Sequence, residues 1–459
     1  MRNLPNHLPG RLALALLLLV PGGPLLAENH LVWNLKADRV SADVKSENVD
    51  SLLEKIAETT GWQIYLEPGI AYESSAKFKD ERPGEALRLL LGNLNFALIP
   101  QATAPSRLYV FRTSQARATR LIRPATKGPR ASKLIPNELI VRLKPGAKIE
   151  DLARLVGAKI IGRIDALNTY RLEFADEAAA RSAREALLDN PDVTGVDSNF
   201  TVDRPSPQQE VAGGIQPSWN LKPKDGSDPC RPIVALVDTP VSVDSAVQPF
   251  VLPSISVTGS ATSPPADLTH GTAMLEAILQ SIQSNMSGGR TGVKILPVDV
   301  YGANSTTTTF EVGQGIYQAV NAGANIVNLS LGGSGDSAFV HGLITSASKL
   351  GVVFFGAAGN EPLTTATYPA AYPEVIAVTA SDPAGQLANY ANHGSFVSIM
   401  APGTSFADFQ GQSYVVTGTS SATAFASGLA AGLADSTQAC PDRVIPTIRN
   451  QLGVKFTSP

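Results

Sequence analysis

The sequence predicts an α/β protein in which a doubly wound, mostly parallel sheet follows two small α+β domains. The C-terminal half alternates near-continuous apolar runs with helical stretches, which is typical of strands that are covered on both faces. Two stretches with the composition of linkers divide the chain, and the segments before and between them mix helix and strand periodicity. The chain has 459 residues, 43% hydrophobic and 17% charged, and is long enough for about three domains.

Residues 1–27 have the pattern of a cleaved secretory signal. Arg2 and Arg11 supply positive charge, residues 12–20 form an apolar run, and Ala27 ends the segment with a small side chain. This pattern directs export, and the apolar run is too short to cross a bilayer as a helix. A membrane anchor is the less favoured alternative. No later stretch is apolar enough to span a membrane, so we expect an exported protein in the periplasm or the medium.

Charge and cysteine content exclude several classes of function. The net charge of −3 provides no strong basic field, so nucleic acid is not an expected partner. Cys230 and Cys440 are the only cysteines, which excludes a disulfide-rich scaffold and a cysteine-rich zinc module. In an exported protein they either pair or stay as free thiols. No metal-binding motif occurs, so we expect no cofactor, and no loop identifies a structural calcium site.

The first domain is expected over residues 28–115. Apolar residues at helical spacing predict a helix that buries Val49, Leu52, Leu53 and Ile56 and ends near Gly61. A second helix begins at Pro83, a favoured first-turn residue. Short strands surround both helices, and this β–α–β–β–α–β order resembles the short N-terminal domain of secretins and TonB-dependent receptors. The resemblance implies docking to a cell-envelope protein, and a stabilising appendage is an equal alternative.

The two linkers differ in composition. Residues 116–134 carry arginine and lysine but no acid, which predicts a solvated basic tether, with a partner-binding strip as the alternative. The second stretch, residues 203–218, is rich in proline, glycine and glutamine. Between them, residues 135–205 predict two helices packed on one antiparallel sheet, with strands at 137–143, 169–174 and 193–202. This domain has no histidine or cysteine, so it is a poor candidate for catalysis.

The third domain, residues 206–459, carries the parallel sheet. Near-continuous apolar runs predict its strands, which we expect at 233–238, 294–300, 325–331, 352–357, 374–380 and 395–400. Helical stretches lie between several of these strands. Sheets of this kind bind their ligands at the carboxyl ends of the strands.

Three side chains of the third domain have the residue types of a catalytic triad. Asp238 closes the first strand, His270 opens a helix and Ser420 opens another. A serine hydroxyl is a weak nucleophile at neutral pH, so it needs a base and a group that orients the base. The order Asp, His, Ser argues against an α/β-hydrolase, in which the serine comes first. Each residue alone has an ordinary structural alternative, such as a cap or a close helix contact, and the three together predict serine catalysis.

Five segments of the third domain resemble the subtilisin-like serine peptidases, or subtilases, in the family order. They are Asp238-Thr239, His270-Gly271-Thr272, Ser330-Leu331-Gly332, Ala357-Ala358-Gly359-Asn360 and Gly418-Thr419-Ser420-x-Ala422. The resemblance implies that Asp238, His270 and Ser420 form the triad, with Asn360 in the oxyanion hole. It also implies that Ser330, Leu331 and Gly332 pair with the substrate backbone. Ala358 and Gly359 are expected beside the substrate pocket.

The second domain resembles a subtilase propeptide, which acts as a folding chaperone and inhibitor. We therefore predict a secreted serine endopeptidase that acts on proteins or peptides and is made as a self-processing zymogen. Two residues depart from the family pattern, Pro240 in the aspartate segment and Ala424 in the serine segment. They bear on catalytic efficiency more than on identity. The alternative function is a catalytically impaired subtilase fold that acts as a cell-envelope binding protein through residues 28–115.

Overall fold

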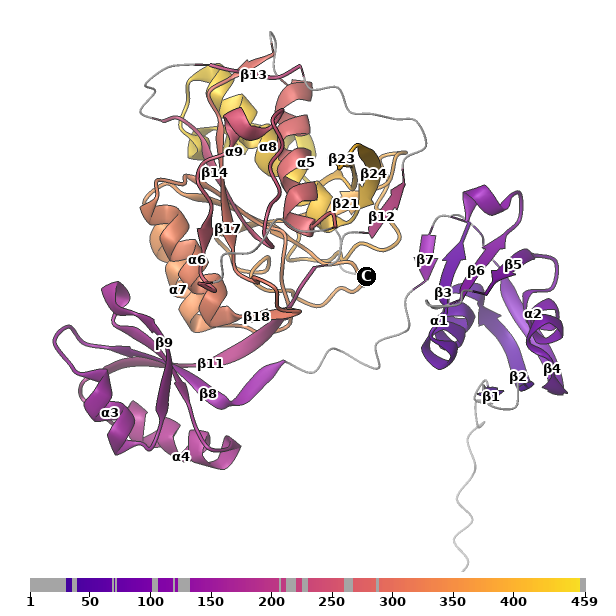
Figure 1. Cartoon of the computed structure of the whole chain (residues 1–459), viewed down its shortest axis with the longest axis horizontal. Helices are drawn as coiled ribbons and strands as arrows, with labels where there is room; N and C mark the ends of the chain where they lie inside the picture. The colour runs from indigo at the N-terminus through magenta and orange to yellow at the C-terminus, as the bar shows by residue number, and fades with distance from the viewer. Residues whose placement is uncertain are drawn as a thin grey trace, which may run out of the picture. The chain divides into compact units, whose positions relative to one another are not determined.

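The computed structural model (Figure 1) describes residues 30–34, 39–67, 70, 72–100, 106–118, 120–122, 133–205, 208–211, 220–224, 230–259, 267–285 and 289–454. The chain divides into two compact units, residues 1–129 and 130–459. The expected signal, residues 1–27, lies outside the described residues. Among the helices of the described residues, none is both long enough and apolar enough to cross a membrane.

The first unit contains two sheets and the helices that cover them. Its elements are β1 (His30–Asn34), β2 (Arg39–Asn48), α1 (Val49–Thr60), β3 (Gln63–Leu66), β4 (Glu73–Glu81), α2 (Pro83–Leu91), β5 (Asn95–Ile99), β6 (Arg107–Phe111), η1 (Gln115–Arg117) and β7 (Arg120–Ile122). Strands β1, β2 and β4 form one sheet, and β5, β6, β3 and β7 form the other. The expected apolar face of α1 is buried, and Gly61 ends this helix with a φ of 69°.

The expected linker over residues 116–134 is partly ordered, which corrects the boundary at residue 115. Strand β7 pairs antiparallel with β3 and places Ile122 in the core of the first unit. At the other end of the stretch, Leu134 already belongs to a strand of the second unit. The run of basic residues hid β7, because a three-residue edge strand has almost no periodicity of its own.

The second region, residues 133–205, is an antiparallel sheet with two helices. Its elements are β8 (Leu134–Leu143), α3 (Ile149–Leu155), β9 (Lys159–Ile164), η2 (Asp165–Leu167), β10 (Thr169–Glu173), α4 (Glu177–Leu188) and β11 (Val193–Asp203). Alternation along β8 sends Leu139 and Val141 towards the helices and Ile140 to the opposite face. That opposite face packs against the third region, so the sheet is covered on both sides.

The third region contains a seven-stranded parallel sheet. Its order is β15 (Ile255–Ser256), β17 (Lys294–Asp299), β14 (Ile233–Asp238), β19 (Ile326–Leu329), β20 (Val353–Ala357), β21 (Val375–Ser381) and β22 (Ile399–Pro402). Figure 1 shows α6 (Thr309–Asn321) beside α7 (Ala338–Ser348), and α8 (Thr419–Thr437) beside both α5 (His270–Asn285) and α9 (Pro441–Leu452). Separate apolar clusters pack on the two faces, so alternate residues of β14 point to opposite sides.

Several elements differ from the sequence expectations. Strand β19 ends at Leu329, two residues before the expected end, and β22 begins four residues later than expected. The second expected linker contains β12 (Gln208–Val211), which pairs with β24 (Gln412–Thr417) of the hairpin that β24 forms with β23 (Thr404–Phe409). Strand β12 has a mostly polar sequence, so only its partner makes it a strand. Cys230 and Cys440 form a disulfide, which decides between the two alternatives for these residues.

Candidate active site

Asp238 and His270 meet at the carboxyl edge of the sheet. Asp238 is the last residue of β14, and His270 is the first residue of α5. Both carboxylate oxygens of Asp238 lie 2.8 Å from His270 Nδ1. Asp238 is fully buried and its Oδ1 also accepts from the N–H of Thr239. This arrangement holds the imidazole by Nδ1 and leaves Nε2 as the nitrogen that can accept a proton.

Small and hydroxyl side chains allow the helix start to lie against the end of β14. Thr239 Oγ1 accepts from the N–H of Gly271 at 2.8 Å. A Cβ on Gly271 would lie 2.3 Å from the Thr239 carbonyl oxygen, so only glycine fits after the histidine. The carbonyl of Pro240 accepts from Thr269 Oγ1 at 2.6 Å. Pro240 therefore helps to join the aspartate and histidine segments through its carbonyl oxygen. This contact does not require the backbone N–H that proline lacks.

Ser420 is the second residue of α8 and follows Gly418, which has a φ of 152°. Its hydroxyl donates to the Ser330 carbonyl oxygen at 3.3 Å, and Ser330 Oγ donates back to the Ser420 carbonyl at 3.1 Å. Within the described residues, Ser420 Oγ makes no hydrogen bond to His270. The structure thus joins Asp238 and His270 directly by hydrogen bonds, whereas the Ser420 hydroxyl is hydrogen-bonded to Ser330. A sequence motif reports residue types and cannot report which rotamer a serine adopts.

Asn360 lies next to Ser420 because its side-chain oxygen binds the start of α8. Asn360 Oδ1 accepts from Thr419 N at 2.8 Å and from Thr419 Oγ1 at 2.9 Å. Because these bonds use the side-chain oxygen, the amide nitrogen Nδ2 of Asn360 is the atom that can donate to another group. A Cβ built on Gly418 would lie 3.3 Å from Asn360 Nδ2 and 3.7 Å from Ser420 N, so both nitrogen atoms lie near Gly418. Such a pair can stabilise a negatively charged oxygen.

The sequence did not indicate Asn392, a buried residue that holds the Asn360 loop. Asn392 Oδ1 accepts from Glu361 N at 2.8 Å and Leu363 N at 3.2 Å. Its own N–H donates to the Gly359 carbonyl oxygen at 2.9 Å. Gly359 has a φ of 110°, and a Cβ there would lie 2.4 Å from Asn392 Nδ2. No motif surrounds Asn392, so only its contacts reveal that it positions the loop.

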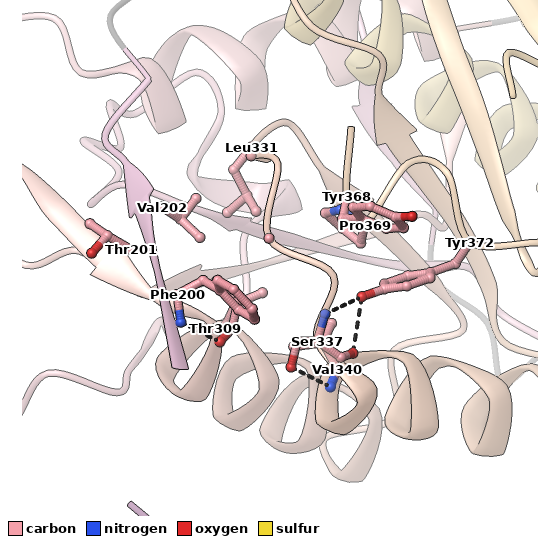
Figure 2. Close-up of a pocket in the computed structure, with 13 residues that line it drawn as sticks. Phe200, Thr201, Val202, Thr309, Leu331, Ser337, Val340, Tyr368, Pro369 and Tyr372 are labelled. Carbon is pink, nitrogen blue, oxygen red and sulfur yellow. Dashed lines mark hydrogen bonds between the residues drawn. The ribbon is translucent and has the colours of Figure 1, made fainter. Parts of the chain in front are cut away.

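The expected substrate-binding residues lie in two places. Ser330, Leu331 and Gly332 directly follow β19, and Leu331 lines a pocket (Figure 2). Phe200 and Val202 of β11 line the same pocket, together with apolar residues of the third region that include Val312, Val340, Tyr368 and Tyr372. Ala358 is fully buried and its N–H donates to the Val378 carbonyl oxygen. Gly359 belongs to the Asn360 loop, as described above.

The electrostatics of the third region include one neutralised carboxyl group near the site. Glu276 lies on α5, six residues after His270, and is 3% exposed. Burial, together with the nearby Asp408 and Asp244 carboxylates, raises the pKa of Glu276 to about 8, and the hydrogen bond from the Asp408 N–H opposes this shift. Throughout the described ranges, no cluster of three or more His, Cys, Asp or Glu side chains is placed to hold a metal ion.

Comparison with known proteins agrees with this geometry. The profile described as "Subtilase family" matches residues 230–444. Subtilisin Savinase of Lederbergia lenta is 30% identical over 209 residues, which cover 43% of this chain and 74% of that protein. The chain belongs to the subtilase family. We refer to residues 220–454 below as the subtilase domain.

Two further comparisons concern other subtilases and the second region. A thermostable alkaline protease of Halalkalibacterium halodurans is 34% identical over 165 residues, 36% of this chain and 45% of the relative. The M-protease of Shouchella clausii is matched over 52% of its length, so the chain spans about half the length of these curated relatives. The profile described as "Fervidolysin N-terminal prodomain" matches residues 122–199. We therefore call residues 133–205 the prodomain.

Two solved structures share the fold. Fervidolysin from Fervidobacterium pennivorans, described as a keratinolytic enzyme related to subtilisin, aligns with a TM-score of 0.53 at 20% identity, over 70% of this chain and 58% of that chain. The epidermin leader peptide processing serine protease of Staphylococcus aureus aligns with a TM-score of 0.52 at 18% identity, over 72% of this chain and 95% of that chain. At this level of identity the likeness establishes the subtilisin-like fold alone.

Proposed function

We propose that the protein is an exported serine endopeptidase that hydrolyses peptide bonds in proteins or peptides and is made as a self-processing zymogen. The Asp238–His270 pair carries this proposal. Two carboxylate oxygens at 2.8 Å from Nδ1 fix the imidazole tautomer and leave Nε2 as the base. The start of α8 supports the same chemistry, because Ser420 N and Asn360 Nδ2 both lie near Gly418.

In the proposed mechanism His270 Nε2 takes the proton of Ser420 Oγ as the oxygen attacks the scissile carbonyl. Ser420 first leaves the Ser330 carbonyl, to which it now donates, through a change of its χ1 rotamer. Asn360 Nδ2 and Ser420 N stabilise the tetrahedral oxyanion. His270 then returns the proton to the leaving amine, and water repeats the sequence on the acyl-enzyme. The protein's own side chains and N–H groups supply every step.

The zymogen proposal is supported by the path of the prodomain's last strand. The end of β11 pairs antiparallel with β18 (Thr306–Thr308), so the prodomain adds a strand to the subtilase domain. Thr201 of β11 also approaches Gly333, whose Cβ would lie 4.0 Å from the Thr201 carbonyl oxygen. An extended substrate would bind in the same manner, by strand addition. Occupation of this strand position by the prodomain would inhibit the enzyme.

We expect self-cleavage between residues 203 and 218. The described parts of this segment support the position. Strand β11 ends at Asp203, beside β18, whereas Gln208 pairs with Thr417, three residues before Ser420. The two described ends of this segment therefore lie at β18 and at β24, the strand that leads to Ser420. Residues 206–207 and 212–219 lie outside the described part of the structure.

Export and docking complete the proposal. The signal at residues 1–27 would send the chain to the periplasm or the medium. We propose that residues 28–115, together with β7, dock to a cell-envelope protein, as the resemblance to the short N-terminal domain of secretins and TonB-dependent receptors implies. The separate core of this unit supports an independent role. Capture of envelope proteins by the full Ser420→Ala chain, compared with the same chain lacking residues 28–122, tests it, and equal capture would contradict it.

Labelling with a fluorophosphonate tests the proposed activity. We expect the matured protein to label at Ser420 and to cleave casein, and Ser420→Ala to do neither. Asn360→Ala should keep labelling but lower kcat by about 100- to 1,000-fold, the range known for the corresponding donor of subtilisin itself. A well-folded wild type that neither labels nor cleaves casein would instead support the alternative, an inactive subtilase fold that serves as an envelope binding protein.

A further inference from the structure

Arg204 directly follows β11, the last strand of the prodomain, and residues 301–305 of the subtilase domain form a binding seat for its side chain. Arg204 Nη1 donates to the Gly302 carbonyl oxygen at 2.9 Å and to the Asn304 carbonyl oxygen at 2.9 Å. The guanidinium carbon lies over the Tyr301 ring, 5.8 Å from its centroid. The backbone N–H of Arg204 donates to the Ser305 carbonyl oxygen at 2.9 Å. All these partners come from residues 301–305.

The loop that forms this seat is fixed by contacts of its own. Asp299 Oδ1 accepts from Tyr301 N at 2.9 Å and from Gly302 N at 2.8 Å. Gly302 has a φ of 56°, and a Cβ there would lie 2.7 Å from Thr258 Oγ1, so the turn requires glycine. The N–H of Asn304 donates to the Tyr301 carbonyl oxygen at 3.0 Å. Within the subtilase domain these bonds do not involve Arg204, so the two carbonyls stay aligned when it leaves.

The chemistry of the seat selects a cation. Two carbonyl oxygens and the face of an aromatic ring present only negative partial charge to the side chain. The buried carboxylate of Asp299, which is 7% exposed, lies beneath the same turn and adds to this charge. A guanidinium uses both hydrogens of one nitrogen on the carbonyls while its plane covers the ring, whereas an ammonium is a point charge that cannot stack. Arginine therefore fits the seat better than lysine.

The position of the seat relates it to substrate. Residues 201–203 pair with β18, the carbonyl oxygen of Thr201 lies near Gly333, and Arg204 directly follows these residues. Arg204 thus occupies a position that a substrate bound by the proposed strand addition would also reach. Tyr301 also donates its hydroxyl to the Asp203 carbonyl oxygen at 2.9 Å, which fixes the backbone beside the seat.

We propose that the carbonyls of Gly302 and Asn304 and the ring of Tyr301 form an arginine-selective subsite of the subtilase domain. Arg204 fills this subsite in the zymogen, and substrates with arginine at the corresponding position fill it after the prodomain leaves. This inference rests on the proposed peptidase function and names the class of peptide that the enzyme prefers.

Peptides based on residues 199–211 test the subsite with matured wild-type enzyme. Position 204 carries arginine, lysine, citrulline or alanine, and citrulline keeps the shape of arginine without its charge. We expect kcat/KM to be highest for arginine, lower for lysine, and about 10- to 100-fold lower for citrulline and alanine, because charge-assisted hydrogen bonds are lost. Equal rates for arginine and alanine would overturn the subsite, and so would peptides that stay uncut while casein is cleaved.

Tyr301 variants provide a matched pair. Tyr301→Phe keeps the ring and removes the hydroxyl, so the ratio of arginine to alanine rates should stay close to that of the wild type. Tyr301→Leu removes the ring, and the ratio should fall. Tyr301 is fully buried, so the leucine variant risks misfolding. The peptide series in wild type does not depend on it.

Hydrogen exchange tests the seat without any catalysis. In the full Ser420→Ala chain, we compare Arg204 with Arg204→Lys and Arg204→Ala. We expect amide exchange over residues 200–205 to be about 10-fold faster with alanine and intermediate with lysine, because the strand end loses its side-chain anchor. Identical exchange in all three chains would overturn the seat. If neither peptides nor casein are cut, the proposed peptidase function fails, and the exchange result still decides whether the seat holds Arg204.

Discussion

The first unit and the prodomain are both small α+β regions, but different contacts bury their sheets. The first unit closes a core of its own that includes Leu52, Leu87 and Leu108. The prodomain buries only one sheet face with its own helices, and on the other face Ile140, Ile164 and Val202 join a cluster of the subtilase domain. A region that shares its core and its sheet with a neighbour depends on that neighbour. This difference supports an independent role for the first unit and an inhibitory role for the prodomain.

The polar contacts of the prodomain and the first unit differ in the same way as their apolar cores. Asn199 Oδ1 accepts from Thr309 Oγ1 and Phe310 N at the start of α6, and Asp197 Oδ2 accepts from Ser337 Oγ and Phe339 N at the start of α7. The prodomain thus binds the N-terminal ends of two helices of the subtilase domain. By contrast, Asp43 of the first unit makes an ion pair with the exposed Lys77 on a neighbouring strand.

Ser420→Ala should have the largest effect on this comparison. It removes the proposed nucleophile, so casein cleavage should fall by more than about 1,000-fold. The prodomain should then stay covalently attached, because no bond between residues 203 and 218 is cut. Gel electrophoresis and intact mass report the length of the chain. Shortening of the purified variant between these residues without added protease would contradict self-cleavage.

Deletion of each region sharpens the comparison. Without residues 28–122 we expect kcat/KM to stay within about twofold, because the apolar core of this unit is its own. Without residues 133–205 the yield of soluble, active enzyme should drop, because the apolar surface around Phe310 and Val340 loses its cover. The yield of active enzyme from each deletion is measured by active-site titration of equal culture volumes, and the titre also gives the enzyme concentration needed for kcat/KM. Equal yields from the two deletions would contradict the inference that the subtilase domain depends on the prodomain and not on the first unit.

Capping substitutions should weaken inhibition by a smaller amount. We expect Asp197→Ala and Asn199→Ala each to raise the inhibition constant of the released prodomain by about 10-fold, since each loses an N-terminal cap. The measurement is inhibition of the matured enzyme by added prodomain. Asp176→Ala is a matched control, because the Asp176 side chain caps the prodomain's own helix α4 by accepting from the N–H of Ala179. If this control raises the constant as much, the effect is loss of prodomain stability rather than of contact.

The smallest expected effect is a pH dependence confined to the subtilase domain. The unfolded pKa of Glu276 is 4.5 and burial raises the folded value to about 8. The folded state therefore binds more protons between these values, and stability falls with rising pH over that window, by at most about 1.4 kcal/mol per pH unit. In the Ser420→Ala background, Glu276→Gln should raise Tm at pH 8 relative to its parent and change it less at pH 5. Equal shifts in Tm at both pH values would contradict this.

The first unit should behave differently with pH. Hydrogen bonds from Thr113 and Arg112 lower the pKa of Glu67 below its usual value. A carboxyl with a lowered pKa stabilises the fold above pH 4.5 and loses that contribution as the pH falls through the folded value. Acid therefore removes the stabilising contribution of Glu67 in the first unit, whereas a rise in pH removes that of Glu276 in the subtilase domain.

The sequence by itself predicted the parallel sheet and the residues of the candidate triad, and the resemblance pointed to Asn360 for the oxyanion hole. Apolar runs report buried strands locally, and Asp238, His270 and Ser420 are recognisable because each stands at a strand end or a helix start. Short edge strands such as β7 and β12 were not predicted, because their stability comes from the partner strand and not from their own composition.

Only the tertiary structure decided the contacts between segments that are distant in the sequence. The disulfide joins residues 210 positions apart, and nothing in either flanking sequence distinguishes a pair from two free thiols. The seat of Arg204 consists of backbone carbonyls, which every residue possesses, so no side-chain pattern marks it. The Ser420 hydroxyl donates to the Ser330 carbonyl oxygen because of the rotamer that the serine side chain adopts. Such features depend on the direction of atoms in space, and residue identity alone does not specify that direction.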